Sequence, residues 1–422
     1  MVKETAAAGR DAEGGQRVLP LSGQLVFGRR ASLLVSAGAV GHALWTSAAP
    51  VLTYRLYAQE WHLTNTVTAG VFAVYPISVV LMLIGFGGIS DQVGRRATML
   101  VGIFASLIGA LSFALAVDVW WLFAGRILMG IGVGLSVSPS TAAVLEFSSP
   151  GRAQSAALTT IAAQAVGFVV ALLLGGALTE YAPWPTHLCF WVLAAFLFIL
   201  LGATWFLPRY LVGDAGSDRP SRTPFVPKGV RRAFAVSSTA MMAAYSFGVL
   251  VASLGGQVEH DLIGSHNALL NGAVLSLFPI VLAIVGVMAR SLSPRMALTV
   301  GALVSGLGMV LLILAVSLRD LPIYLLATAA AGGAYSLLFV GGLQVISAVA
   351  PANHRGGIFS ALYLLGYLSM GVLALLLGAI ATTHGLILAV DLGAAALILM
   401  NAATLVLTAA MPSPASYQET GP

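Results

Sequence analysis

The feature that most constrains this chain is a series of long segments without charge. One of them, "LCFWVLAAFLFILLGATWFL" (residues 188–207), holds no charged residue at all. A helix needs roughly 20 apolar residues to cross the hydrocarbon core of a bilayer. Charged residues make up 8% of this chain, whereas a soluble domain carries about 25%. Such a chain cannot cover a soluble surface, so we predict an integral membrane protein in contact with a lipid bilayer.

Twelve apolar windows follow one another along the chain. Their residues do not alternate between apolar and polar, as the strands of a membrane barrel would, and helices are the other structure that can span a bilayer. We therefore predict an all-α fold with twelve transmembrane helices. The windows lie at about residues 32–54, 66–88, 97–117, 119–144, 156–180, 187–208, 232–256, 268–289, 296–317, 321–346, 357–380 and 385–410.

The basic residues are distributed unevenly between the loops. With both termini on the inside, only Arg55 and Arg319 fall in the outer loops, and the remaining loop arginines and lysines fall inside. Short cytoplasmic loops carry an excess of Lys and Arg. The pattern predicts a multi-pass protein of the cell (inner) membrane with both termini in the cytoplasm. Because the same asymmetry accounts for the net charge of +5, we expect no nucleic-acid partner.

A polar stretch rich in Pro, Gly and Ser, residues 209–230, divides the chain into two sets of six predicted helices. The first 30 residues have no short apolar core followed by a small-residue cleavage site, so they are not a signal peptide. The predicted organisation is a flexible cytoplasmic tail (1–30), an N-terminal half (31–208), a linker (209–230), a C-terminal half (231–410) and a cytoplasmic tail (411–422).

The two halves share a spacing. Arg152 precedes the "ALLLG" that begins at Ala171 by 19 residues, and Arg355 precedes the "ALLLG" at Ala374 by the same 19. Two parallel repeats around a central cavity are a transporter design, with the substrate held near the middle of the membrane.

Two short motifs carry a family resemblance. "GGISDQVGRR" (residues 87–96) lies between the second and third predicted helices, and "RILMGIGVG" places Arg126 four residues before Gly130 in the fourth. The first is similar to the loop pattern Gly-x-Leu-Ala-Asp-Arg-x-Gly-Arg-Lys, with Gln92 in place of the first Arg. With the twelve spans and the repeat, the chain resembles the major facilitator superfamily over nearly its whole length.

The resemblance implies a transporter that moves a small-molecule substrate by alternating access, is not an enzyme and needs no cofactor. Protons are the expected coupling ion, and a monomer is expected. Export of a drug-like or amphipathic metabolite is favoured; the alternative is proton-coupled uptake, and a more remote one is a non-transporting receptor or scaffold. No Walker sequence is present, so direct ATP coupling is not expected. No His and Cys spacing predicts a metal site.

Exporters of the family carry Gly-x-x-x-Gly-Pro-x-x-Gly-Gly in the fifth helix. Here Gly167, Gly175 and Gly176 remain, but Gly-Pro is replaced by Ala171-Leu172. The alternative interpretation is that these small residues serve close helix packing.

We interpret the loop motif as a cytoplasmic gate. The family resemblance implies that Asp91 meets the positive N-terminus of the eleventh helix, and Arg95 or Arg96 is expected to pair with Glu146. The alternative is that these charges only fix the topology. The gate candidates are Gly87, Asp91, Gly94, Arg95, Arg96, Glu146, Arg152 and Arg355.

Two ionisable residues inside the spans are candidates for coupling, because such residues are costly in a bilayer. Arg126 has no carboxylate at its depth in neighbouring helices, and the resemblance implies proton coupling or contact with a substrate anion; the alternative is a hydrogen-bonded helix brace. His42 could carry a proton at physiological pH; the alternative is a neutral core histidine. For Asp391 we expect a structural role.

In the family, helices 1, 4, 7 and 10 line the cavity. Aromatic and Met side chains suit an apolar or amphipathic ligand, although each residue could equally be a packing residue. The predicted substrate-binding residues are Trp45, Ser138, Thr141, Met242, Tyr245, Ser246, Tyr335, Ser336 and Gln344.

Overall fold

The structure, a computed structural model, describes residues 27–86, 93–148, 153–208, 228–250, 264, 267–350 and 355–411, and within them the chain forms helices and no strands, which confirms the all-α prediction. The helices of the N-terminal half are α1 (Arg29–Ala48), α2 (Tyr54–Glu60), α3 (Asn65–Phe86), α5 (Arg95–Ala114), α6 (Val119–Phe147), α7 (Ala153–Tyr181) and α8 (Leu188–Trp205). Those of the C-terminal half are η1 (Lys228–Val230), α9 (Arg231–Val249), α11 (Ala268–Ala289), α12 (Pro294–Leu318), α13 (Leu321–Val349), α14 (Arg355–His384) and α15 (Leu386–Ala409).

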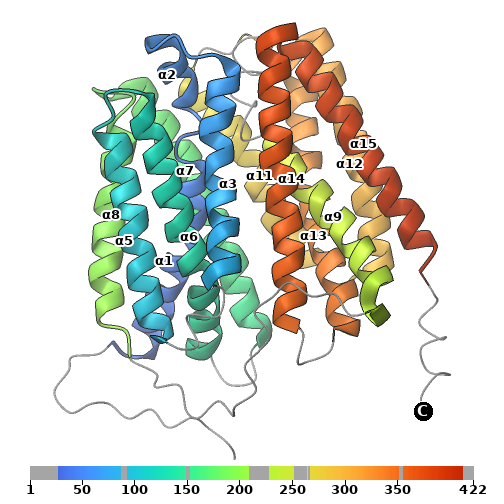
Figure 1. Ribbon diagram of the computed structural model, residues 1–422, viewed down its shortest axis with the longest axis horizontal. Coiled ribbons are helices and arrows are strands. Elements are labelled where there is room, and N and C mark those ends of the chain that lie inside the picture. Colours follow the sequence, from blue (N-terminus) through green and yellow to red (C-terminus); the bar gives the residue numbers. More distant parts are fainter. Residues whose placement is uncertain are drawn as a thin grey trace, which may run out of the picture.

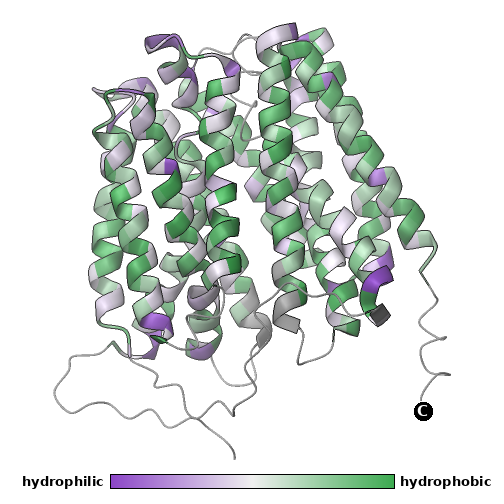
Figure 2. Cartoon of the chain, viewed as in Figure 1, coloured by the Kyte–Doolittle hydropathy of each residue, from purple (hydrophilic) through white to green (hydrophobic). Residues whose placement is uncertain are grey.

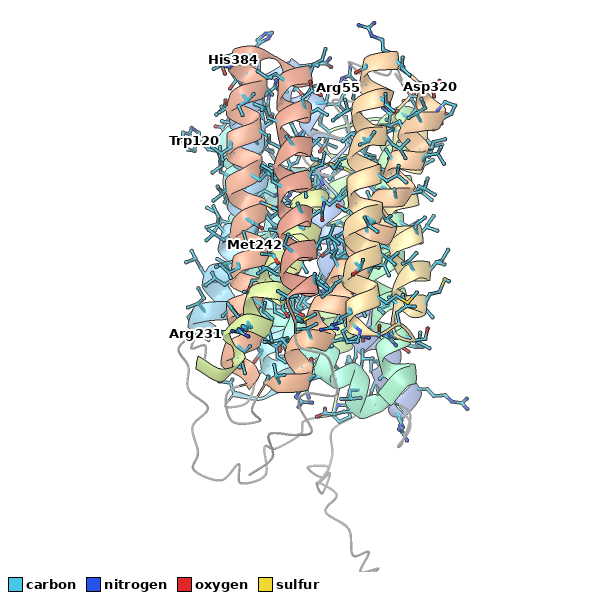
Figure 3. All side chains as sticks on the ribbon, turned by 90° about the vertical axis from the view of Figure 1, so that its right-hand side faces the viewer. Arg55, Trp120, Arg231, Met242, Asp320 and His384 are labelled. Atoms are coloured by element: carbon cyan, nitrogen blue, oxygen red, sulfur yellow. The ribbon has the colours of Figure 1, made fainter. Side chains whose placement is uncertain are left out.

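The long helices run side by side and give the molecule two ends (Figure 1). We call the end that carries the short helix α2 the α2 end, and the end at which α1 begins and α15 finishes the terminal end. Arg55, Asp320 and His384 lie toward the α2 end, Arg231 lies toward the terminal end, and Met242 lies between them (Figure 3).

The two halves repeat at a constant distance along the chain. Pro76 interrupts α3 and Pro279 interrupts α11, 203 residues later. The same shift carries the bounds of α3 onto those of α11, and it carries α6 and α7 onto α13 and α14 to within one residue. Positions in these helices of one half therefore have structural equivalents in the other.

Contacts between the halves follow this repeat. In the N-terminal half α1 packs on α6 and α7, and in the C-terminal half α9 packs on α13 and α14. Between the halves, α3 packs against α14 and α7 packs against α11. These two seams are equivalent under the shift of 203, so the two halves meet through the same pair of helices on either side.

The surface of the bundle suits a bilayer. Figure 2 shows hydrophobic residues along the middle of the helices and hydrophilic ones mainly toward their ends. Trp120, Trp184 and Tyr181 are exposed near the α2 end, as expected for aromatic residues at a membrane interface. Among the described residues, ten helices are long and apolar enough to cross a membrane.

The two remaining long helices, α1 and α9, do not meet that apolar criterion. They occupy equivalent places in the two halves, and each is covered by at least three neighbouring helices. Because neighbours separate them from lipid, they can carry buried polar residues such as Ser36, His42, Ser237 and Ser246. These two helices are therefore where interior polar chemistry is concentrated.

The first apolar window, 32–54, extends too far as a single helix, which is a correction to the sequence prediction. α1 ends at Ala48, and the chain turns through Pro50 before α2 begins at Tyr54. Proline lacks the N–H that a continuing helix would need. The carbonyl of Pro50 instead accepts hydrogen bonds from the backbone N–H and the hydroxyl of Thr53.

Candidate functional site

The predicted gate residues divide between those that the structure describes and those outside it. Gly87, Asp91 and Arg152 lie outside the described residues. Arg355 is the first residue of α14. Gly94 directly precedes α5 with φ 95°, a left-handed conformation that glycine adopts without steric cost.

Arg95 forms an ion pair with Glu146, and both side chains are about one quarter to one third exposed. Arg96 does not share this partner. It donates to the carbonyl oxygen of Leu207 at 3.0 Å and lies 5.4 Å from the centre of the Trp205 ring. The Arg95–Glu146 pair joins α5 to α6 within one half, so this pair by itself does not tie the two halves together.

A cavity of about 300 Å³ adjoins these residues at the terminal end. Arg95, Arg96 and Glu146 line it together with Trp205 from the end of α8. The cavity lies within the N-terminal half, away from the seams between the halves.

Arg126 lies in α6, and its side chain is fully buried. Its Nη1 donates to the carbonyl oxygens of Thr46, at 3.5 Å, and of Ser47, at 3.1 Å. Both carbonyls belong to the last turn of α1, whose negative dipole end favours a cation. The guanidinium thus binds the end of α1 next to its break at Pro50.

Aromatic rings surround the same guanidinium, and no carboxylate pairs with it among the described residues. Its central carbon is 4.7 Å from the centre of the Tyr75 ring, 5.7 Å from Tyr54 and 5.8 Å from Phe72. Nε and Nη2 find no hydrogen-bond acceptor there. A guanidinium has five N–H donors, so three remain unsatisfied in this conformation.

His42 is fully buried in α1 and faces a polar partner on each side of its ring. Nδ1 contacts the carbonyl oxygen of Ala39, and Nε2 lies 3.4 Å from the hydroxyl of Ser136. That hydroxyl is also 2.7 Å from the carbonyl oxygen of Gly132. A neutral imidazole can accept the Ser136 hydrogen at Nε2. A protonated imidazole can donate to Ser136 while the hydroxyl donates to Gly132, so either form finds partners.

The predicted substrate-binding residues are not all brought to one place. Trp45 stacks on Phe196 of α8, with ring centres 4.8 Å apart, inside the N-terminal half. Ser138 and Thr141 are exposed on α6, and Met242 is half-buried in α9.

The polar members in the C-terminal half are buried to different degrees. Ser336 is buried and donates to the carbonyl oxygen of Leu282 at 2.5 Å. Ser246 is buried, Gln344 is half-buried, and the Ser246 hydroxyl and the Gln344 carbonyl oxygen have no hydrogen-bond partner among the described residues.

Tyr245 and Tyr335 do come together, with ring centres 5.9 Å apart. They belong to a larger group of rings that the sequence analysis did not include. Tyr245 also contacts Tyr367 at 4.8 Å, and Tyr335 contacts Phe278 at 5.8 Å. We call the aromatic set the six residues Tyr245, Phe278, Tyr335, Phe339, Tyr363 and Tyr367, which come from α9, α11, α13 and α14.

The pattern that could have predicted the missing members is a spacing of four. Tyr335 and Phe339 lie one turn apart on α13, and Tyr363 and Tyr367 lie one turn apart on α14, so each pair shares a helix face. α14 is the eleventh of the predicted spans and was not among the expected cavity helices, and its two tyrosines were therefore missed.

The glycines of the fifth-helix motif lie at helix contacts. A Cβ at Gly167 would be 2.0 Å from the carbonyl oxygen of Gly41 in α1, and one at Gly176 would be 2.6 Å from that of Ala268 in α11. A Cβ at Gly175 would meet no atom within 4 Å. Two of the three glycines thus allow the close helix packing named as the alternative to an exporter signature.

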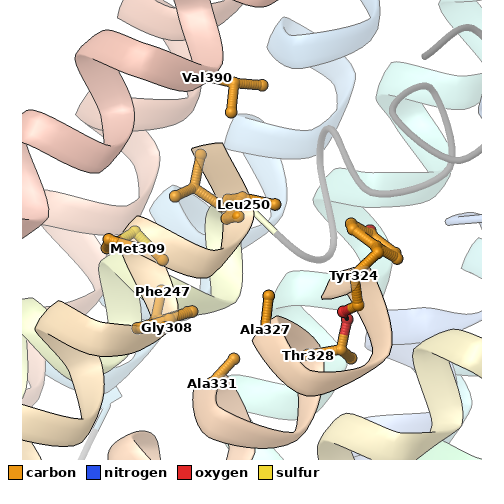
Figure 4. A pocket seen from close by; sticks show the side chains of 10 residues that line it. Phe247, Leu250, Gly308, Met309, Tyr324, Ala327, Thr328, Ala331 and Val390 are labelled. Carbon is orange, nitrogen blue, oxygen red and sulfur yellow. Dashed lines mark hydrogen bonds between the residues drawn. The ribbon is translucent and has the colours of Figure 1, made fainter. Parts of the chain in front are cut away.

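A second cavity lies inside the C-terminal half, between α9, α12, α13 and α15 (Figure 4). Phe247, Met309, Tyr324 and Val390 are among the residues that line it. Its volume of about 20 Å³ is about that needed for a single water. It is therefore a packing gap and not a substrate site.

Comparison with known proteins adds the family. A family model described as Major Facilitator Superfamily matches residues 34–375. The MFS-type transporter EfpA of Mycobacterium tuberculosis is 38% identical over 102 residues, which cover 24% of this chain and 19% of EfpA. The puromycin resistance protein pur8 of Streptomyces alboniger is 30% identical over 149 residues, 35% of this chain and 29% of that protein. The multidrug resistance protein MdtH of Proteus mirabilis is 32% identical over 153 residues, 35% of each chain. The matched segments thus span about a third or less of these relatives.

The fold has solved counterparts. The crystal structure of a mutant of the nucleoside transporter NupG has a TM-score of 0.74 and 12% identity, and the match covers 90% of this chain and all of that one. A bacterial homologue of the human lysosomal transporter Spinster, solved in an inward-facing and unoccupied conformation, has a TM-score of 0.71 and 15% identity, covering 90% and 97%.

Proposed function

The chain belongs to the Major Facilitator Superfamily, a family of membrane transporters and not of enzymes, and we propose that it exports a small amphipathic molecule in exchange for protons. Its two six-helix halves would move against each other and expose a central site to one side of the membrane at a time. The protein acts as a monomer in the inner membrane, with the terminal end in the cytoplasm.

The observation that carries alternating access is that hydrogen bonds join the halves at the α2 end. The hydroxyl of Thr382 accepts from the backbone N–H of Thr66 at 2.8 Å, and the carboxylate of Glu180 accepts from the backbone N–H of Ala268 at 2.7 Å. Closure at this end supports a state in which the substrate site communicates with the other.

His42 is the residue we assign to proton transfer. Arginine does not lose its proton in proteins, so Arg126 can act in coupling only as a fixed charge. The imidazole of His42 can bind and release a proton near neutral pH. Its contacts with Ala39 and Ser136 allow both protonation states, because the Ser136 hydroxyl can rotate between His42 and Gly132.

The gate at the terminal end is part of the same proposal. Asp91 would bind the N-terminus of α14, which begins at Arg355, and this contact would break when the cytoplasmic side opens. The Arg95–Glu146 pair would hold the start of α5 in place for it. Gly94, Arg96, Arg152 and the loop residue Gly87 complete the gate.

Export is favoured because relatives such as pur8 and MdtH are named for resistance to drugs. The test uses inside-out vesicles with an acidified lumen and a fluorescent pH probe. Candidate antibiotics and aromatic metabolites are added to wild-type and His42→Gln vesicles. We expect a substrate to release lumenal protons from wild-type vesicles alone. If protons instead enter the lumen together with the substrate, or if His42→Gln vesicles respond like wild type, export by proton exchange through His42 is wrong.

A further inference from the structure

The centre of the molecule has two chemically different walls, and the repeat makes the difference visible. Each member of the aromatic set has an equivalent 203 residues earlier, and five of these six are polar or small and not aromatic. We call them the polar set. In the order of Tyr245, Phe278, Tyr335, Phe339, Tyr363 and Tyr367, the equivalents are His42, Tyr75, Gly132, Ser136, Thr160 and Gln164.

The aromatic set forms a continuous wall of rings. Tyr335 and Phe339 are stacked with ring centres 5.9 Å apart and planes inclined by 15°, and Phe339 continues to Tyr363 at 6.3 Å. α11 and α14, which carry three of the six rings, are the helices that pack on the N-terminal half. Several of the rings are half-buried although they lie near the middle of their helices, so their faces remain open to the interior.

The polar set offers hydrogen-bonding groups in the equivalent places. His42 and Ser136 contact each other at 3.4 Å, just as the rings of their equivalents Tyr245 and Phe339 contact each other with centres 6.4 Å apart. Thr160 and Gln164 lie one turn apart on α7 and are half-buried. The N-terminal wall can therefore bind polar groups where the C-terminal wall mainly offers ring faces.

The two walls meet at Tyr75. Its hydroxyl lies close enough to Tyr367 for the two groups to interact electrostatically, and its ring lies 4.7 Å from the guanidinium of Arg126. Neither set contains a carboxylate, and Arg126 keeps unsatisfied donors on Nε and Nη2. The fixed charge beside the meeting point of the walls is thus positive.

We infer that the ligand of the proposed transporter is an aromatic molecule with a neutral or anionic hydrogen-bonding end, and not a cation. Its ring system stacks on Tyr335, Phe339 and Tyr367, and its polar end faces Gln164 and Arg126. Stacked rings give offset or edge-to-face contacts that favour flat ligands. A buried cation would need a carboxylate partner, which both walls lack, and Arg126 would repel it.

The inference rests on the proposed transport function, but binding can test it without a gradient. The probes are 2-naphthamide, 2-naphthoate and 2-naphthylmethylammonium, which share one ring system and differ in charge. Their affinities are measured by tryptophan fluorescence quenching and by thermal shift on the detergent-purified protein. We expect the amide and the carboxylate to bind at least about tenfold more tightly than the ammonium compound, because only the latter places an unpaired positive charge beside Arg126.

Variants locate the two ends of the ligand. Tyr335→Leu removes a central ring and should weaken all three probes about equally. Arg126→Gln should reduce the preference of the site for the carboxylate over the ammonium compound. Phe196→Leu, which removes a ring of α8 that stacks on Trp45 outside the aromatic set, is the matched control and should leave all three affinities unchanged.

The inference fails if the ammonium compound binds most tightly, or if Tyr335→Leu has no more effect than Phe196→Leu. In the second case the aromatic set is only packing. The order of affinities does not depend on coupling or direction. A correct order with no proton exchange in vesicles would overturn the proposed function and leave the ligand class standing, and the converse result would do the opposite.

Discussion

Among single residues, the buried guanidinium of Arg126 is the costliest group in the described interior. It donates to the two carbonyls at the end of α1, lies among three aromatic rings, and has no counter-ion in the described part of the chain. An uncompensated buried ion costs several kcal/mol, and proteins retain such a cost chiefly at functional sites.

Replacing Arg126 with Met separates function from bracing. Met fills a similar volume without a charge, so we expect the melting temperature in detergent to stay the same or rise, while proton-coupled transport is lost. The lost hydrogen bonds contribute only about 1 kcal/mol each. If the melting temperature instead falls by many degrees, Arg126 is primarily a brace for α1.

Gly94 makes a prediction about backbone conformation. Its φ of 95° lies in the region that glycine alone adopts easily, so Gly94→Ala should destabilise the protein by roughly 1–2 kcal/mol. No atom lies within 4 Å of a Cβ at Gly94 or at Gly202, which is helical. Gly202→Ala is therefore the matched control, and it should be neutral or stabilising by up to about 1 kcal/mol. Equal thermal stability of the two variants would contradict the assignment.

Between helices, the seams that join the halves depend on small residues. A Cβ at Gly272 of α11 would be 2.3 Å from the carbonyl oxygen of Leu172 in α7, and one at Gly378 of α14 would be 2.2 Å from the side chain of Ala69 in α3. Ala69 and Gly272 are equivalent under the repeat. Both seams thus close at the α2 end by bringing one helix tightly against another, as small residues allow between membrane helices.

Enlarging one of these residues should keep the α2 end open. In a Cys189→Ala background, a cysteine at Ser276, which is 1% exposed, should react slowly with a water-soluble maleimide. Adding Gly272→Val should accelerate the reaction by about tenfold, because the clash prevents closure of the seam. Gly306→Val, where a Cβ would meet no atom within 4 Å, should not change the rate. Unchanged labelling with Gly272→Val would show that this contact does not hold the seam.

For the molecule as a whole, orientation follows from charge. The proposed cytoplasmic side is the terminal end, where Arg29, Arg95 and Arg295 lie at helix starts. The α2 end instead carries the aspartates that begin helices: Asp118 accepts from the backbone N–H of Trp120 at 2.9 Å, and Asp320 from that of Ile323 at 2.9 Å. These two aspartates therefore have a structural task as helix caps.

Labelling from each side of the membrane checks the orientation. In the Cys189→Ala background we expect a cysteine at His384, exposed at the α2 end, to react with an impermeant maleimide in intact cells. A cysteine at Ser291, exposed between α11 and α12 at the terminal end, should react only in inside-out vesicles. The reverse pattern would invert the proposed topology and with it the direction assigned to transport.

The class of the fold could be predicted without any coordinates, because apolar length and low charge permit few structures in a bilayer. The family could be predicted as well, since "GGISDQVGRR" and "RILMGIGVG" specify it locally. The end of α1 could not: the apolar run continues through Pro50, and the break there involves Arg126 from α6 as well as proline. Tyr245 and Tyr335 were indicated by their residue type, but nothing local showed that Tyr363 and Tyr367 of α14 would join them.

Which wall of the interior is aromatic and which is polar is known from packing alone. Tyr245 and His42 occupy the same place in the repeat, and the structure shows that one contacts rings and the other contacts Ser136. Packing also moved Trp45 from the expected cavity to a contact with Phe196. Helical periodicity tells which residues share a face. The neighbour that this face meets is set by how the apolar helices pack against one another, and no local pattern records it.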